Sequence, residues 1–250
     1  MDKRLIAERF ARARNTYSTE ARVQHQVAAK MMNLLQTYTP AERFRRIVEF
    51  GCGTGSYSRL LSRELHPERL LLNDLCGEMR ECVAELLTDN ILFLADDAET
   101  AEFPTQTDLI TSCSTLQWFA DAGGFFRRCH RFLAPDGYLA FSTFGKENMF
   151  EVQALTGNGL DYLPKETLQT LLSPCYDTVH LSEEIVRLSF RTPLDVLKHM
   201  QQTGVTGTEK RVWTRGRLQT FCHDYAERFA DADGQVTLTY HPIYVIAKKK

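Results

Sequence analysis

A chain of 250 residues in which 43% are apolar and 25% are charged can bury a hydrophobic core, and this excludes a disordered protein. The formal net charge of −2 at pH 7 excludes a strongly basic protein of the kind that binds nucleic acid. The seven cysteines form no C-x-x-C pair, and no apolar run reaches the ~20 residues of a membrane span. We therefore expect a cytoplasmic protein with reduced thiols, without a metal site and without a membrane partner.

The first forty residues predict a helical segment. Apolar residues recur at spacings of three and four from Phe10 to Ala28, and Gln24 falls on the same stripe. We expect amphipathic helical structure over about residues 2–38, which Pro40 separates from the next element.

The middle of the chain alternates short apolar strands with amphipathic helices. Such an alternation implies a mostly parallel sheet with helices on both faces, as in an α/β fold. We expect strands over 47–50, 70–74, 91–94, 108–112 and 138–143, and helices over about 56–66, 77–88 and 121–133.

The last hundred residues are less regular. We expect helices over 147–157, 164–173, 193–203 and 214–229, a strand-like stretch over 177–190, and a closing strand or bent strand pair over 236–240 and 243–247. No linker separates two units. We therefore predict one domain over 1–250, in which 1–40 form a helical lid, 41–145 the cofactor-binding core, and 146–250 an acceptor-side insertion with the closing strands.

Three glycines directly follow the first strand and open the next helix. Gly51, Gly53 and Gly55 let the backbone turn sharply and approach a ligand closely. Glu49 stands two residues before the first glycine, where it would repel a pyrophosphate but can pair with an ammonium group. The G-x-G-x-G spacing therefore favours a zwitterionic amino-acid cofactor over a dinucleotide.

Two acids end the next two strands. Asp74 lies about 20 residues beyond the glycines, where a carboxylate can accept hydrogen bonds from ribose hydroxyls. Asp97 ends the third strand. Because the carboxyl ends of parallel strands share one rim of the sheet, we expect both acids beside the glycine loop.

These features together resemble class I S-adenosylmethionine-dependent methyltransferases. Residues 48–57 are similar to that family's first motif, Asp74 to its ribose-binding acid, Asp97 to its adenine-binding acid, and 135–139 to its turn before the fifth strand. The resemblance covers 45–145. It implies a Rossmann-like, seven-stranded, mostly parallel sheet with an antiparallel last strand, S-adenosylmethionine as cofactor and S-adenosylhomocysteine as product.

The resemblance also implies a set of cofactor-binding residues. The chain departs from many relatives at Cys113, where they carry Asn, and at Asp96, where they carry Gly. The first change leaves cofactor binding intact if that position contributes mainly backbone atoms. The implied set is Glu49, Gly51, Cys52, Gly53, Gly55, Asp74, Leu75, Asp97, Ala98 and Cys113.

A narrower resemblance concerns the methyl acceptor. Gln117 and Trp118 after the fourth strand, the helix that carries Tyr17, and residues 200–207 and 238–241 are similar to the malonyl-acyl-carrier-protein O-methyltransferases of biotin synthesis. This resemblance implies methylation of the free carboxylate of a malonyl thioester. We expect Tyr17 to cover the cofactor, and Gln117 and Trp118 to line the acceptor channel. A malonyl carboxylate is already ionised at neutral pH, so no general base is needed.

Three clusters of basic residues could steer an acidic acyl carrier protein to a monomeric enzyme. They lie in residues 1–30, at Arg127, Arg128 and Arg131, and in residues 198–217. Each cluster could equally be a solvated helix face. Two other functions remain open: methylation of a free carboxylic acid such as aconitate, and a non-catalytic role as a cofactor-sensing partner protein.

Overall fold

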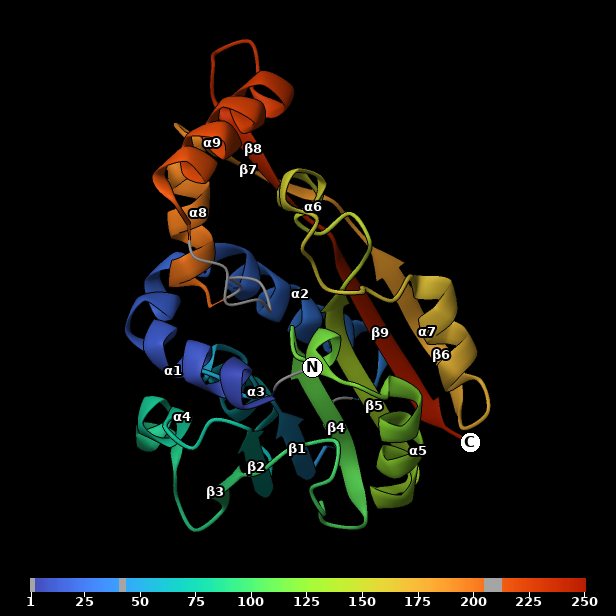
Figure 1. The fold of residues 1–250 in the computed structure, drawn as a ribbon. Coiled ribbons are helices and arrows are strands. Elements are labelled where there is room, and N and C mark those ends of the chain that lie inside the picture. Colours follow the sequence, from blue (N-terminus) through green and yellow to red (C-terminus); the bar gives the residue numbers. More distant parts are fainter. Residues whose placement is uncertain (1–2, 41–43, 205–212) are drawn as a thin grey trace.

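The computed structural model describes residues 3–40, 44–204 and 213–250, with the side chains of 13 and 15–20 outside that description. Its centre is a seven-stranded sheet in the order β3-β2-β1-β4-β5-β9-β6, in which only β9 runs antiparallel to its neighbours (Figure 1). The mostly parallel, seven-stranded prediction is therefore confirmed. The strands are β1 (Arg46–Phe50), β2 (Arg69–Asp74), β3 (Ile91–Ala95), β4 (Thr107–Cys113), β5 (Leu133–Phe144), β6 (Tyr176–Glu183) and β9 (Pro242–Lys249).

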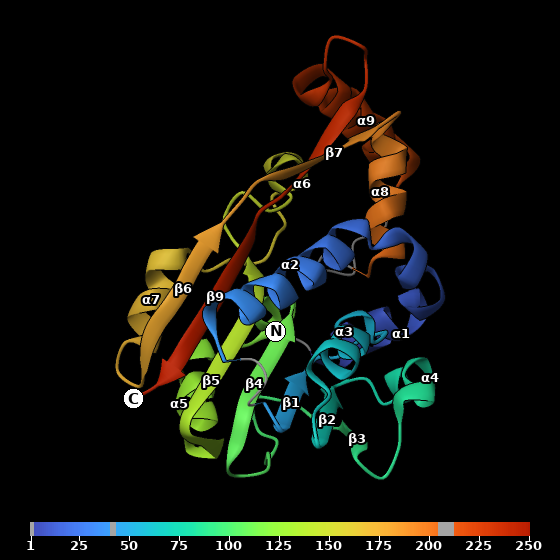
Figure 2. The same ribbon diagram turned by 180° about the vertical axis from the view of Figure 1, so that it is seen from behind.

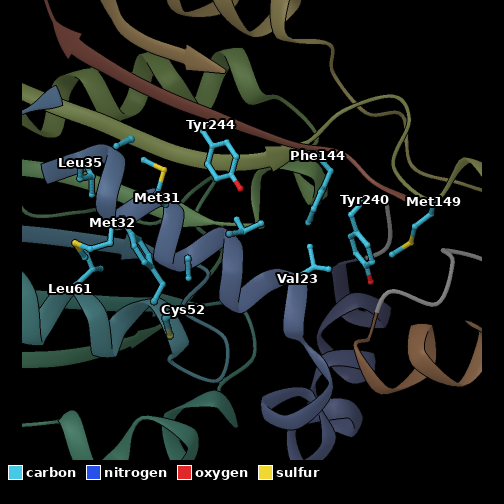
Figure 3. Close-up of a cluster of buried hydrophobic side chains, with 14 of the residues drawn as sticks. Val23, Met31, Met32, Leu35, Cys52, Leu61, Phe144, Met149, Tyr240 and Tyr244 are labelled. Carbon is cyan, nitrogen blue, oxygen red and sulfur yellow. The ribbon is translucent and has the colours of Figure 1, made fainter. Parts of the chain in front are cut away.

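Helices cover both faces of this sheet because successive strand residues point to opposite sides. Ile47 joins a core with α2 and α3, whereas its neighbour Val48 joins a second core with α5 and α7. Figure 3 shows part of the first core, where Met31 and Leu35 of α2 lie near Tyr244 of β9. The described helices are α1 (Lys3–Glu20), α2 (Arg22–Tyr38), α3 (Ser56–Leu65), α4 (Met79–Cys82), η2 (Ala84–Leu86), η3 (Leu116–Trp118), α5 (Ala122–Phe132), α6 (Phe150–Thr156), α7 (Lys165–Leu172), α8 (Pro193–Gln202) and α9 (Arg215–Phe229).

The N-terminal segment is helical as predicted, and it consists of two helices, α1 and α2, rather than one. The chain bends at the buried Ala21, whose φ of −80° and ψ of 48° are not helical. The bend lets α2 pack on the sheet and on α3, while α1 turns away toward α4 and α8 (Figure 2). A straight helix could not make both sets of contacts.

The helix predicted over 77–88 is also shorter than expected, because α4 ends at Cys82 and only the 3-10 turn η2 follows. In a longer helix, the carbonyl of Cys82 would accept a hydrogen bond from the backbone amide one turn later. Here it accepts one from the guanidinium of Arg59 instead, at 2.8 Å. The backbone then tightens, and Leu86 donates to Val83 at 2.9 Å.

A separate antiparallel pair, β7 (Val186–Phe190) with β8 (Val236–Tyr240), carries α8 and α9 away from the main sheet (Figures 1 and 2). We call these four elements the C-terminal arm. The carboxylate of the buried Glu151 in α6 accepts hydrogen bonds from the amide of Thr239 at 3.1 Å and from its hydroxyl at 2.6 Å. This contact fixes the arm to the core. Among the helices that the structure describes, none combines the length and the apolar character needed to cross a membrane.

The interior position of β9 predicts a large cost for truncating its buried side chains. Ile246 is fully buried, so Ile246→Ala should lower the free energy of unfolding by roughly 3 kcal/mol. Ile185→Ala is the matched control at a position that is 43% exposed, and it should cost less than about 1 kcal/mol. Urea denaturation measures both values. Equal losses for the two variants would contradict the assignment of β9 to the core.

Candidate functional site

The glycine loop after β1 is held by contacts that leave no room for a side chain at Gly51. Gly51 has a φ of +67°, and a Cβ atom there would lie 2.2 Å from Oγ1 of Thr115. The Thr115 hydroxyl donates to the Gly51 carbonyl at 3.2 Å, and the amide of Gly53 donates to Oδ2 of Asp74 at 2.8 Å. The loop is thereby tied to the ends of both β4 and β2. Gly55 begins α3 as its N-terminal cap.

A cavity lies over this loop at the carboxyl ends of the strands. Every cofactor-binding residue predicted from the sequence lines it except Gly55, which lies behind it at the start of α3. The two N-terminal helices form the opposite wall. They contribute Lys3, Ile6, Ala7, Phe10, Arg14, Gln24 and Ala28.

Five side chains of the cavity wall each hold a buried oxygen that has no partner among the described residues, and two of these oxygens belong to Glu49 and Gln24. Glu49 is 1% exposed and Gln24 is 7% exposed, and Oε2 of the first and Oε1 of the second bond to none of the described residues. Burial raises the pKa of Glu49 to about 8. A buried, unsatisfied polar atom costs about 1–3 kcal/mol. Both acceptors therefore suit a ligand that brings hydrogen-bond donors.

Gln24 is absent from the site that the sequence predicts. Because Gln24 lies on the apolar stripe of the N-terminal helix, the sequence pattern indicated a residue that packs in the core. The available signal was its chemistry, because an amide on an otherwise apolar, buried stripe needs a polar partner.

Asp74 is positioned by two backbone amides. Gly53 donates to its Oδ2 at 2.8 Å and Cys76 to its Oδ1 at 2.9 Å. Burial raises the pKa of Asp74 to about 6, although these two hydrogen bonds stabilise the ionised form. The carboxylate thus lies at the end of β2 in a fixed orientation.

Asp97 is bound by the helix that covers the cavity. The ammonium of Lys3 lies 2.5 Å from Oδ2 of Asp97 and also contacts Glu99. Glu99 in turn accepts the backbone amides of Ala120 and Asp121, each at 2.8–2.9 Å. Burial lowers the pKa of Lys3, but the two carboxylates outweigh it and raise the pKa overall. These ion pairs therefore fix the start of α1 at the rim of the sheet.

A second, larger cavity of about 1080 Å³ adjoins the first. Trp118 lines both cavities, and Phe10 of α1 packs edge-on against it with ring centroids 5.6 Å apart. Gln117 lines the second cavity only. Its Nε2 donates to the Ser114 carbonyl at 2.7 Å, and its Oε1 accepts from the Thr143 hydroxyl at 3.2 Å, so the amide is held at both ends.

The walls of this second cavity come from β5, α6, α8, α9 and β8. Its apolar members include Phe144, Met149, Val152, Leu194, Met200, Trp213, Phe221 and Tyr240, and its basic members are Arg9, Lys198 and Arg217. Tyr17 belongs to α1, but its side chain lies outside the described ones, so its predicted position over the cofactor stays a prediction.

Comparison with known proteins agrees with this geometry. The family described as "Methyltransferase domain" matches residues 48–141. A curated malonyl-acyl-carrier protein O-methyltransferase from Bacteroides helcogenes is 60% identical over the full length of both chains. A protein of the same name from Bacteroides fragilis is 56% identical over 99% of this chain, which spans 51% of that protein.

Among solved structures, the YcgJ protein from Bacillus subtilis is similar with a TM-score of 0.65 and 14% sequence identity, over 89% of this chain and 99% of that one. This similarity shows a shared fold, and it confirms the Rossmann-like prediction. Because a relative that is 60% identical matches over the full length of both chains, the chain belongs to the malonyl-acyl-carrier-protein O-methyltransferase family of methyltransferases.

Proposed function

We propose that this chain transfers the methyl group of S-adenosylmethionine to the free carboxylate of a malonyl thioester on an acyl carrier protein, the reaction that starts biotin synthesis. The observation that carries the proposal is that Trp118 lines both cavities. A methyl donor in the first cavity and an acceptor in the second would therefore meet at one side chain. The name shared by the relatives from Bacteroides supports the malonyl acceptor.

The residues of the first cavity fit S-adenosylmethionine. The unpartnered acceptors on Glu49 and Gln24 suit its ammonium group, and Asp74 suits its ribose hydroxyls. Asp97 also lines the cavity, where it would accept a hydrogen bond from the adenine amino group beside its ion pair with Lys3. When bound, the cofactor supplies an electrophilic methyl group attached to a sulfonium sulfur.

The second cavity would hold and align the acceptor. A malonyl carboxylate is ionised at neutral pH, so its oxygen can form the new bond to carbon while the carbon–sulfur bond breaks and the electron pair stays on sulfur. No proton moves, and the chain needs no base. Gln117, held at both ends of its amide, can offer its second N–H to the acceptor. Trp118 and Phe10 exclude water from the junction between the cavities. The rate enhancement then comes from the alignment of the carboxylate with the methyl group.

A transfer assay tests the proposal directly. Labelled S-adenosylmethionine is offered with malonyl-acyl carrier protein, malonyl-coenzyme A, free malonate and aconitate. We expect transfer to the carrier-bound malonyl group to be favoured strongly. Transfer to a free acid in preference, or cofactor binding with no transfer to any of these acceptors, would overturn the assignment of the acceptor.

Gln24→Ala should weaken binding of S-adenosylhomocysteine about tenfold, because one hydrogen bond to a charged group is lost. The same variant should bind 5′-methylthioadenosine, which lacks the amino-acid part, with an affinity within about twofold of the wild type. Isothermal titration measures both, and Gln26→Ala, at an exposed position of the same helix, is the control. An equal loss for both compounds would place Gln24 in packing rather than in recognition.

Binding of S-adenosylhomocysteine should strengthen as the pH rises. Because burial raises the pKa of Glu49 to about 8, the carboxyl is mostly protonated in the ligand-free protein at neutral pH and must ionise to pair with an ammonium group. Affinity should therefore rise roughly twentyfold between about pH 6.5 and about pH 8.5. Glu49→Gln should bind weakly and flatten this dependence. A variant that keeps the full pH dependence would assign the titration to another group.

Trp118→Ala should slow methyl transfer by roughly a hundredfold while the dissociation constant for S-adenosylhomocysteine changes less than about threefold. The physical reason is that the side chain shapes the junction between the cavities and keeps water out of it. Single-turnover kinetics and titration measure the two effects. If both quantities change equally, Trp118 serves the cofactor cavity alone. Tyr17→Phe, measured in the same assay, tests the predicted role of Tyr17 as a lid over the cofactor.

A further inference from the structure

We infer that the acidic carrier protein docks at the mouth of the second cavity, on α8 and the first turn of α9, and not on the other basic clusters of the chain. The inference rests on the proposed function, because a malonyl group on a carrier must be threaded into this cavity by its extended prosthetic arm. The carrier itself then has to sit where the cavity opens.

The burial of the lining residues locates that opening. Residues from the core elements, Phe144, Met149 and Tyr240, are buried. Leu194 and Trp213, from α8 and the residues just before α9, are 51% and 45% exposed. The cavity thus runs from the junction at Trp118 outward to the C-terminal arm, and Figures 1 and 2 show α8 and α9 standing away from the main sheet.

The rim of this opening has the chemistry that an acidic partner requires. Lys198, Arg215 and Arg217 are exposed, and they form no ion pair with the residues that the structure describes. The acids on the two helices are Asp195 and Asp224, each half-buried, and the exposed Glu227, which lies beside Asp224 in α9. The exposed Trp213 and Leu194 add apolar surface between the cations, and such a mixed patch suits an acidic protein with an apolar recognition helix.

The basic cluster on α5 is engaged elsewhere. Arg128 donates to the carbonyls of Thr100 and Ala101, both at 2.8 Å, and contacts Glu102 at 3.2 Å. Arg127 lies 3.9 Å from Asp121. Neither side chain lines a cavity. Arg128 is therefore a structural residue of the loop before β4.

Three cations of the N-terminal cluster are likewise paired with acids of distant segments. Lys3 pairs with Asp97 and Glu99, Arg14 with Glu81 at 3.3 Å, and Lys30 with Glu184 at 2.6 Å. These cations hold α1 and α2 to the rest of the fold. Two cations of the cluster on α8 and α9, Lys198 and Arg217, line the second cavity itself, together with Arg9 of α1.

Charge reversal at the mouth tests the inference. The double variant Arg215→Glu and Arg217→Glu is compared with Arg127→Glu, which reverses an exposed cation on α5. Malonyl-acyl carrier protein and malonyl-N-acetylcysteamine are the two acceptors. At low salt (about 20 mM), kcat/KM for the carrier substrate should fall at least roughly tenfold more than kcat/KM for the small thioester. The difference should shrink at about 300 mM salt, because screening removes long-range attraction. Arg127→Glu should show no such difference.

Two results would overturn the inference. One is an equal loss on both acceptors, which would mean that the substitutions damage the cavity itself. The other is a carrier-specific loss in Arg127→Glu and none at the mouth, which would move the docking surface to α5. Failure of the proposed function is distinguishable, because the wild-type protein would then methylate neither malonyl thioester.

Discussion

The close approach of Gly51 to Thr115 is the contact on which the site depends. Two loops that leave neighbouring parallel strands, β1 and β4, can touch there only because one of them has no side chain. The loop after β1 forms the floor of the first cavity, and the loop after β4 continues into Gln117 and Trp118. A single steric constraint therefore brings the two cavities together.

Register in the sheet adds the acids to this junction. Glu49 lies opposite Leu72 on one side and Thr111 on the other, so it is buried between two strands and only 1% exposed to solvent. The same burial that destabilises its charge makes the cavity selective for a cationic group. At the rim, by contrast, the charge of Lys3 stabilises two carboxylates, and these ion pairs hold α1 across the opening of the cavity.

The strands, the glycine loop and the positions of the rim acids could be predicted from the sequence, because they depend on local patterns. An apolar run followed by G-x-G-x-G and an acid at the end of the next strand leave few alternatives. The bend at Ala21 could not be predicted, since the apolar stripe runs through it and the bend arises from packing against two different surfaces. The early end of α4 depends on Arg59, which is 23 residues away from the carbonyl that it binds.

Charge patterns were the least informative part of the sequence. Three basic clusters look alike in the printed chain, but tertiary structure pairs Lys3, Arg14, Lys30 and Arg128 with carbonyls or acids of distant segments. Gln24 shows the reverse case, in which a residue that fits a packing stripe faces a ligand cavity. Both depend on contacts between residues far apart in the chain, which a single sequence does not record.

The interior position of β9 also bears on how the protein is made. β5 ends about a hundred residues before β9 begins, and β9 lies between β5 and β6 in the finished sheet. During synthesis the edge of β5 therefore stays unpaired until residues 242–249 have left the ribosome. An unpaired, apolar edge is a template for intermolecular strand pairing. The nascent chain thus passes through a long interval in which aggregation competes with closure of the sheet, and the C-terminal arm is completed just before that interval ends.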